Sequence, residues 1–203
     1  MIYNILLDKM LTIKQNQIRM IKARGYDTSH EDWILTVKPD KFEKKLIKKH
    51  GQYPIRKLLF GEYTKPNCRP LFVYYIGLQE GKQIKADPIQ VFVTKMTEEK
   101  KDGLLIINSN LSSKASTYLK YVTEYQYQIF KEEELNCNLL SHDYVADYQL
   151  VEFNIKPSYL HTLTLDDPVV RYFNYPKGSI IKVKEDIHLD VLLDEIYYYC
   201  VVG

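Results

Sequence analysis

The stretch Leu165–Asp186, LDDPVVRYFNYPKGSIIKVKED, decides the fold of the C-terminal part of this chain. Asp167 can cap a short helix with its carboxylate, and Pro168 suits the first helical position, where no amide donor is needed. Three side chains of that helix then share one face: Val169, Tyr172 and Phe173. The pattern predicts one or two turns of helix packed on a core.

A turn and a strand are expected directly after this helix. Residues 175–178, YPKG, place proline second and glycine fourth, as a type I turn prefers. Residues 179–184 then alternate apolar side chains with lysines, which is typical of a half-buried strand. The apolar run 196–202, IYYYCVV, can pair with that strand. None of these groups forms a nucleophile, a metal ligand set or a phosphate cradle, so composition alone favours a compact packing motif.

Length and composition limit the possible classes of protein. The chain has 203 residues, of which 45% are hydrophobic and 27% charged, an ordinary globular balance with enough length for one full core or two small ones. A net charge of +2 is too small to indicate nucleic-acid binding by itself. Three widely spaced cysteines, Cys68, Cys137 and Cys200, favour a reducing compartment over a disulfide framework. No signal peptide or membrane-spanning segment is expected, and no membrane partner.

The first fifty residues predict helices. Apolar positions at helical spacing run from Ile2 to Ile21 and end at Arg24-Gly25. Thr28–Glu31 has the pattern of a capping box, which predicts a second helix with Trp33 in the core. Asp40 can cap a third helix whose lysines form a solvated stripe or, alternatively, a weak phosphate-facing patch.

From residue 51 onward, aromatic and branched segments alternate with helical patterns. RKLLFGEY and LFVYYIGL predict paired strands, Asp87-Pro88 begins a helix that Gly103 would end, and LLIIN predicts a buried strand. QIF and LNCNLL look like further short strands. Such alternation indicates an α/β layer. We place a boundary near Cys137, which gives an α/β domain over residues 1–137 and a small α+β domain over residues 138–203.

The search for catalytic groups yields one pattern. No paired Cys or His stands at ligand spacing, so no metal site, catalytic residue or cofactor is predicted. The set Asp40, Glu43, Lys44 and Lys45 superficially resembles the PD…ExK set of metal-dependent nucleases with a restriction-like fold. Its residues lie within one or two turns of a helix, whereas that family takes them from a sheet, so chance explains the match better.

The motifs around residue 170 resemble those of a known family. DPVVRYF, then KGSIIKVK, then YYYCVV resemble the C-terminal assembly domain of the fifth subunit shared by eukaryotic nuclear RNA polymerases, which has an equivalent small subunit in archaeal polymerases. That pattern is approximately D-P-[VI]-[AV]-R-Y-[YF]-G, then K-R-G-[QD]-[VI]-[VI]-K-[IV], then a Tyr-rich strand. The resemblance implies a subunit-interface or assembly motif at Asp167, Pro168, Val169, Arg171, Tyr172, Lys177 and Gly178. Asn174 stands where glycine is usual, and of an entry motif H-x-L-V-P-x-H only His142, Val145 and flanking residues match.

A fainter, collinear likeness extends upstream and covers nearly the whole chain. It resembles the N-terminal jaw domain of the same subunit, in which a helix start of the form M-T-P-S-A-K lies beside downstream DNA. The corresponding residues here include Ser112, Ser113 and Lys114, which the resemblance implies to be DNA-proximal. Hydroxyls and a lysine at a helix start can hold phosphate, but they can equally well cap the helix.

The resemblance implies a noncatalytic subunit of a multisubunit DNA-directed RNA polymerase. It would dock on the largest subunit and the polymerase core, form part of the lower jaw, and contact downstream double-stranded DNA weakly and nonspecifically. Divergence from the cellular pattern suggests a copy encoded by a large nucleocytoplasmic DNA virus, located in host cytoplasm and virion; a cellular copy would be nuclear. The alternatives are the metal-dependent nuclease and an adaptor that joins another complex.

Overall fold

The chain forms two compact units, Met1–Cys137 and Asn138–Gly203. This division comes from a computed structural model that describes residues 2–50, 58–78, 81–122, 126–137, 147–152, 159–185 and 195–203. Within those ranges no helix combines the length and the apolar character needed to cross a bilayer. The three cysteines are free thiols, with Cys68 and Cys137 exposed and Cys200 buried.

The first unit is a four-stranded sheet between helices. Its strands are β1 (Gly61–Tyr63), β2 (Leu71–Ile76), β3 (Asp102–Ile107) and β4 (Tyr127–Lys131). Its helices are α1 (Ile2–Ala23), the 3₁₀ helix η1 (Asp32–Thr36), α2 (Pro39–His50), α3 (Ala86–Glu99), α4 (Ser113–Tyr121) and α5 (Glu132–Asn136). The strand order is β1-β2-β3-β4, with β1 antiparallel to β2 and the other neighbours parallel. The predicted alternation of helix and strand is therefore confirmed.

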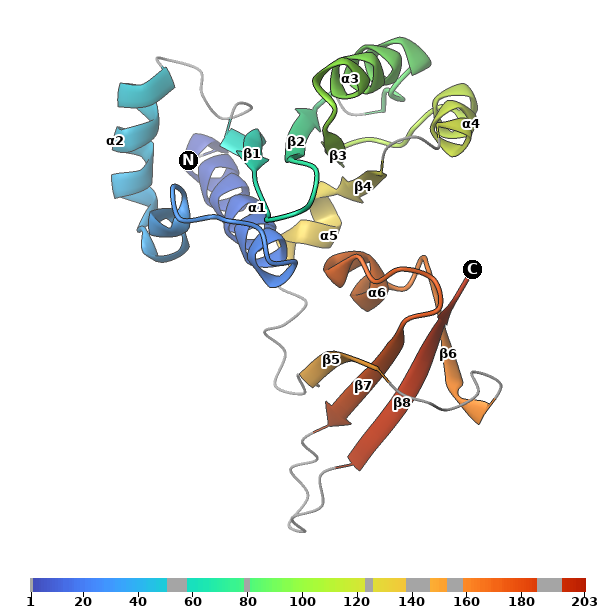
Figure 1. Ribbon diagram of the computed structural model, residues 1–203. Helices are drawn as coiled ribbons and strands as arrows, with labels where there is room; N and C mark the ends of the chain where they lie inside the picture. Colours follow the sequence, from blue (N-terminus) through green and yellow to red (C-terminus); the bar gives the residue numbers. More distant parts are fainter. Residues whose placement is uncertain are drawn as a thin grey trace. The chain divides into compact units, whose positions relative to one another are not determined.

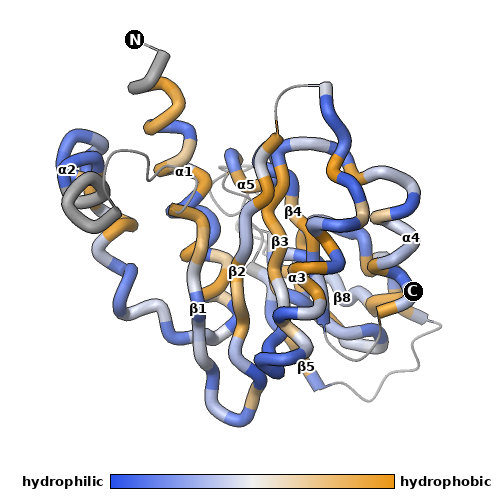
Figure 2. Tube along the Cα trace, turned by 90° about the horizontal axis from the view of Figure 1, so that it is seen from above, coloured by the Kyte–Doolittle hydropathy of each residue, from blue (hydrophilic) through white to orange (hydrophobic). Residues whose placement is uncertain are grey.

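The core of the first unit lies on both faces of this sheet. Figure 1 shows α3 and α4 on one side of the strands and α1 with α5 on the other. β3 is buried from Gly103 to Ile107, and Figure 2 shows it as a continuous hydrophobic strand between β2 and β4. A Cβ atom at Gly103 would lie 2.6 Å from the Phe92 ring and 2.8 Å from the Tyr127 ring, so only glycine lets α3 pack this closely.

Some local predictions for the first unit are wrong. The Thr28–Glu31 box does not begin an α-helix: the Thr28 hydroxyl donates to Asp32, and a short 3₁₀ helix follows. Trp33, expected in the core, is 37% exposed beside Phe42. The capping box fails because the Glu31 carboxylate, which it would use, accepts from the Tyr63 hydroxyl instead.

Two predicted boundaries also move. α3 ends at Glu99, where Lys100 caps it in a left-handed conformation with φ 54°, and not at Gly103, which lies inside β3. Leu135 and Asn136, predicted to begin a strand, lie instead in helix α5, whose first turn is closed by the Glu134 carboxylate, which accepts from the Lys131 backbone N–H. Cys137 lies in a bend, and residues 138–140 of the predicted LNCNLL strand lie outside the described residues.

The second unit is a smaller mixed sheet with one short helix. Its elements are β5 (Asp147–Val151), β6 (His161–Thr164), α6 (Pro168–Phe173), β7 (Ile180–Glu185) and β8 (Glu195–Val202). The strand order is β5-β7-β8-β6, with β6 parallel to β8 and the other neighbours antiparallel. The predicted pairing of the strand after residue 179 with the tyrosine-rich strand is confirmed. Together the two units make an α+β protein with an α/β first part.

Candidate interaction site

The first turn of α6 is built by its cap. Asp167 Oδ1 accepts hydrogen bonds from the backbone N–H groups of Val169, at 2.9 Å, and Val170, at 3.4 Å. Pro168 occupies the first helical position, where its missing N–H leaves no donor unsatisfied. These bonds confirm the cap predicted from the sequence, and they begin the segment 167–179, which we call the α6–turn motif.

The buried face of α6 differs by one position from the prediction. Val170 and Tyr172 are buried, whereas Val169 and Phe173 are half-buried. Val170 packs in a cluster of four buried aliphatic residues, with Ile181, Val183 and Val201. The predicted inward face is therefore confirmed at Tyr172 and wrong at Val169, because Val170 is the residue that packs in the core cluster.

The departure from the family pattern at Asn174 has a simple structural basis. Asn174 ends α6 in the left-handed conformation, with φ 57°, and its N–H donates to the carbonyls of Arg171 and Val170. The N–H of Tyr175 also donates to the Val170 carbonyl, which completes a helix-ending pair of bonds. Asparagine is the residue that best tolerates this conformation after glycine, so the position keeps its geometry without the usual glycine.

The turn after α6 is shifted by one residue from the predicted one. Its closing hydrogen bond runs from the Ser179 N–H to the Pro176 carbonyl, so proline is first and glycine third. Gly178 has φ 87°, which type II turns require at their third position. The Gly178 N–H donates to Val201, and Lys177 Nζ donates to the Gly203 carbonyl at 3.2 Å. The turn is therefore tied to β8.

The α6–turn motif thus separates into two sets of residues. Asp167, Val170 and Tyr172 serve the fold of the unit, by capping or by burial. Of the residues predicted as the interface, Pro168, Lys177 and Gly178 are exposed, and Arg171 is half-exposed. A partner can reach these four residues, together with the half-buried Val169.

The predicted DNA-proximal residues lie at the start of α4. The Ser112 hydroxyl accepts the Ala115 N–H at 3.3 Å, so it caps the helix. Ser113 and Lys114 are exposed in the first turn. Of the two roles weighed for Ser112, capping is the one the hydrogen bond supports, while Ser113 and Lys114 are accessible to a ligand.

Sequence reasoning missed two lysines beside this helix start. A parallel bridge joins Ile84 to Leu111, and the N–H and carbonyl of Ile84 bond to Asn110 and Ser112. The bridge brings the exposed Lys82 and Lys85, which precede α3, next to the start of α4. We call residues 82–85 and 110–114 together the α4-start surface. Only the bridge reveals this grouping, because the two segments are far apart in the sequence.

The first unit also buries charged side chains that the sequence did not mark. Lys14 Nζ, on α1, lies 2.8 Å from Glu31 Oε2 and donates to the Tyr63 hydroxyl at 3.1 Å. Gln17 donates to the same hydroxyl, which itself donates to Glu31 at 2.5 Å. Burial, and secondarily the Glu31 carboxylate, raise the pKa of the Tyr63 phenol. We call these four residues the Lys14 network.

A buried carboxylate, that of Glu132, lies at the start of α5. Glu132 accepts Lys9 Nζ at 2.7 Å and the Tyr75 hydroxyl on its other oxygen. Asn16 on α1 bonds to the carbonyl of Leu135 at 2.8 Å. These contacts attach α1 to α5. The buried side chains of Asn16 and Glu132 therefore have hydrogen-bond partners and connect the layers of the unit.

The nuclease alternative finds no support in these positions. Asp40, Glu43, Lys44 and Lys45 all belong to α2, on successive turns of one helix. Within the described ranges, no three His, Cys, Asp or Glu side chains gather where they could hold a metal ion. His142 and Val145 of the family's entry motif lie outside the described residues.

The chain thus combines a first unit, whose four-stranded sheet is parallel except for β1, with a second unit, whose small mixed sheet carries a capped helix and a turn bonded to β8. Residues 118–202, which begin within α4, match the protein family described as RNA polymerase Rpb5, C-terminal domain.

Relatives named as RNA polymerase subunits agree with this match. The chain is 22% identical over 191 residues to DNA-directed RNA polymerase subunit 5-like protein 1 of Arabidopsis thaliana, covering 88% of this chain and 89% of that protein. It is 21% identical to subunit RPABC1 of DNA-directed RNA polymerases I, II and III of Caenorhabditis briggsae, over 86% and 88% of the two chains. DNA-directed RNA polymerase subunit 5 of Acanthamoeba polyphaga mimivirus is 29% identical over 128 residues, 49% of this chain and 61% of that one. The family match and these relatives confirm the expected resemblance to the shared fifth subunit of RNA polymerases.

Proposed function

We propose that this chain is a noncatalytic subunit of a multisubunit DNA-directed RNA polymerase. The observation that carries the proposal is the match of residues 118–202 to the Rpb5 C-terminal domain, together with relatives named as polymerase subunits that span most of the chain. The subunit would contribute structure only, as a folded part that stabilises the jaw of the enzyme. Nucleotide addition would belong to the large subunits.

The second unit would dock on the largest subunit through the α6–turn motif. In support, the motif is rigid, because its helix is capped at both ends and its turn is bonded to β8. Its outward side chains include the cations of Arg171 and Lys177. A rigid surface loses little conformational entropy on binding, which favours a stable subunit contact. We expect carboxylates on the facing surface of the largest subunit.

The first unit would form part of the lower jaw and border downstream DNA at the α4-start surface. The exposed Lys85, Lys114 and Ser113 lie close together there and can contact phosphates. Lysine contacts to phosphate carry no base information, so DNA contact would be nonspecific. With a net charge of +2, the isolated chain should bind DNA poorly.

Purification of the tagged chain from its native source tests membership in a polymerase. Mild affinity purification, mass spectrometry and a transcription assay on the eluate should recover the two largest polymerase subunits in equal amounts, with RNA synthesis. Arg171→Glu should reduce that recovery, as should Gly178→Val, which strains the turn. Lys44→Glu, an exposed lysine on α2, is the matched control for a charge reversal. Recovery with unrelated partners would instead favour the adaptor alternative.

DNA contact needs a separate test with the assembled polymerase. Lys85→Glu and Lys114→Glu should lower retention on downstream duplex DNA at low salt, and each should reduce the dependence on salt concentration by about one phosphate contact. Lys120→Glu, at the exposed lysine in the last turn of α4, is the control. Equal retention by all four enzymes would contradict a DNA role for the α4-start surface, and submicromolar DNA binding by the isolated chain would contradict the proposed weakness.

The source proposed for the chain is a large nucleocytoplasmic DNA virus. The mimivirus relative supports this source, since its identity to the chain is higher than that of the plant and nematode relatives over a shorter stretch. A viral copy would be found in cytoplasmic factories and virions, whereas a cellular copy would be nuclear. Immunostaining of the native source distinguishes the two, and exclusive nuclear staining would contradict the viral origin.

A further inference from the structure

The pairing of β2 with β3 continues beyond its last backbone pair through a side chain. The ladder of the two parallel strands ends at Ile76 and Ile107. Beyond it, the N–H of Leu78 donates to Asn108 Oδ1 at 2.8 Å, and Asn108 Nδ2 donates to the Leu78 carbonyl at 2.8 Å. The Ser109 hydroxyl donates to the same Oδ1 at 3.1 Å and so orients the amide. An asparagine amide carries the same donor and acceptor as a peptide group, so Asn108 takes the place of a strand partner.

The segment that begins at Leu78 is attached at both ends to the loop after β3. Its first attachment is the pair of bonds between Leu78 and Asn108. Its second is the parallel bridge of Ile84 with Leu111. The exposed Lys82 lies between these two attachments, on the α4-start surface. Asn108 is therefore one of the two anchors of the segment that carries Lys82.

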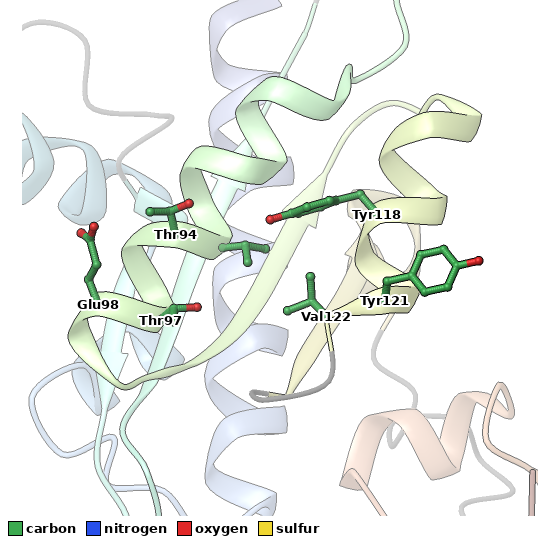
Figure 3. A pocket seen from close by; sticks show the side chains of 7 residues that line it. Thr94, Thr97, Glu98, Tyr118, Tyr121 and Val122 are labelled. Atoms are coloured by element: carbon green, nitrogen blue, oxygen red, sulfur yellow. The ribbon is translucent and has the colours of Figure 1, made fainter.

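Two other lysines of this surface are held by helix packing as well. Lys85 is the N-cap residue of α3, and Lys114 lies in the first turn of α4. Figure 3 shows the Tyr118 ring extending from α4 toward α3, and Tyr118 packs on the hydrophobic cluster that includes Val93 of α3. The core between the two helices thus helps to fix Lys85 and Lys114, whereas Lys82 precedes both helices.

We propose that Asn108 is a positioning residue for DNA contact by Lys82. Lys82 contributes a phosphate contact in addition to those of Lys85 and Lys114, and Asn108 keeps its segment ordered before DNA arrives. Because the segment is already ordered, little conformational entropy is lost when Lys82 binds. This inference rests on the DNA role proposed above for the α4-start surface, and it adds to that role the residue that orders one of its cations.

Hydrogen exchange of the full chain measures the anchor directly. Asn108→Ala removes the acceptor of the Leu78 N–H, so this amide should exchange about tenfold faster. Asn110→Ala is the matched control, because Asn110 is exposed in the same loop and bonds to Ile84 through its backbone carbonyl, which alanine keeps. Thermal melting checks that both variants keep their fold. Equal exchange of the Leu78 amide in both variants would mean that Asn108 does not anchor the segment.

A double-mutant cycle in the assembled polymerase tests the positioning role. Lys82→Gln should lower the affinity for downstream duplex DNA about fivefold at low salt and reduce the salt dependence by about one phosphate contact. Asn108→Ala should lower the affinity about threefold, because binding by Lys82 then costs more conformational entropy. In the Lys82→Gln enzyme, Asn108→Ala should have almost no further effect, whereas its effect should add to that of Lys114→Glu. A merely structural role for Asn108 would give additive losses in both combinations.

The same measurements distinguish this inference from the proposed function. If Lys114→Glu weakens DNA binding but the losses from Asn108→Ala and Lys82→Gln are additive, the positioning role is wrong while the DNA role of the surface stands. If no lysine variant of the α4-start surface changes the affinity for DNA, the DNA role is wrong, and so is the role of Asn108. Asn110→Ala should match the unaltered enzyme, and a loss equal to that of Asn108→Ala would overturn the assignment to Asn108.

Discussion

The first unit buries charged side chains within a layered core, whereas the second unit depends on four buried aliphatic residues ringed by tyrosines. In the first, Lys14 is fully buried on α1 and bonded to groups from β1 and the loop after α1. In the second, the backbone bonds of the cap and turn replace such contacts. Damage to the first unit should therefore be greatest where a charge loses its partner, and to the second where a methyl group or a cap is lost.

The largest effect is expected in the Lys14 network. Glu31→Ala removes the carboxylate partner of Lys14, whose side chain is 1% exposed, and should lower the free energy of unfolding of the first unit by about 3 kcal/mol. Urea unfolding followed by the fluorescence of Trp33, the one tryptophan of the chain, measures it.

An exposed ion pair provides the contrast for that experiment. Lys22 and Asp32 lie 2.7 Å apart near the same loop, but their side chains are 55% and 37% exposed. Lys22→Ala should cost less than about 1 kcal/mol, because water already solvates both charges. Equal losses for the two variants would mean that burial does not distinguish these pairs.

The second unit should be most sensitive at Val170. Val170→Ala removes two methyl groups from the four-residue cluster and should cost about 2 kcal/mol. The adjacent Val169→Ala changes a half-buried side chain and should cost less than half as much. Hydrogen exchange of the amides of β7 and β8 reports the second unit separately. A larger loss at Val169 would support the helix face first predicted from the sequence.

Alkaline pH should weaken the first unit through Tyr63. Its pKa is raised above the ordinary value of 10.0 by burial and by Glu31, so the folded state keeps a proton that the unfolded state loses. The unfolded state then binds fewer protons, and the free energy of unfolding falls by about 1.4 kcal/mol per pH unit above that value. Below it the contribution is constant.

Tyr63→Phe is the variant that checks this prediction. It removes the titrating phenol, so the decline measured by Trp33 fluorescence above the ordinary phenol pKa should become shallower by one proton equivalent. Tyr121→Phe, at an exposed tyrosine, should leave the slope unchanged. If the free energy of unfolding declined equally with pH in all three proteins, groups other than Tyr63 would cause the loss of stability at alkaline pH.

The sequence predicts elements whose signals are local. The α6 cap, the strand after it and the amphipathic pattern of α1 depend on neighbouring residues, and each was found. The turn was shifted by one residue because residues 175–178 and 176–179 both offer proline and glycine at acceptable positions. Contacts between residues distant in the sequence could not be predicted in this way. A lysine on a helix is usually exposed, and nothing near Lys14 in the sequence indicates that Glu31 is its partner. The grouping of Lys85 with Lys114 likewise depends on one bridge between distant segments.

The smallest effect concerns the cap of α6, where two adjacent aspartates form a natural comparison. Asp167→Ala removes the acceptor for two backbone N–H groups and should cost the second unit about 1 kcal/mol. Asp166→Ala changes an exposed carboxylate of the same charge and should cost almost nothing. Hydrogen exchange at the amides of Val169 and Val170 provides the measurement, because these donors lose their partner only in the first variant. Equal protection in both variants would mean that Pro168 and the packing of Val170 are enough to begin the helix.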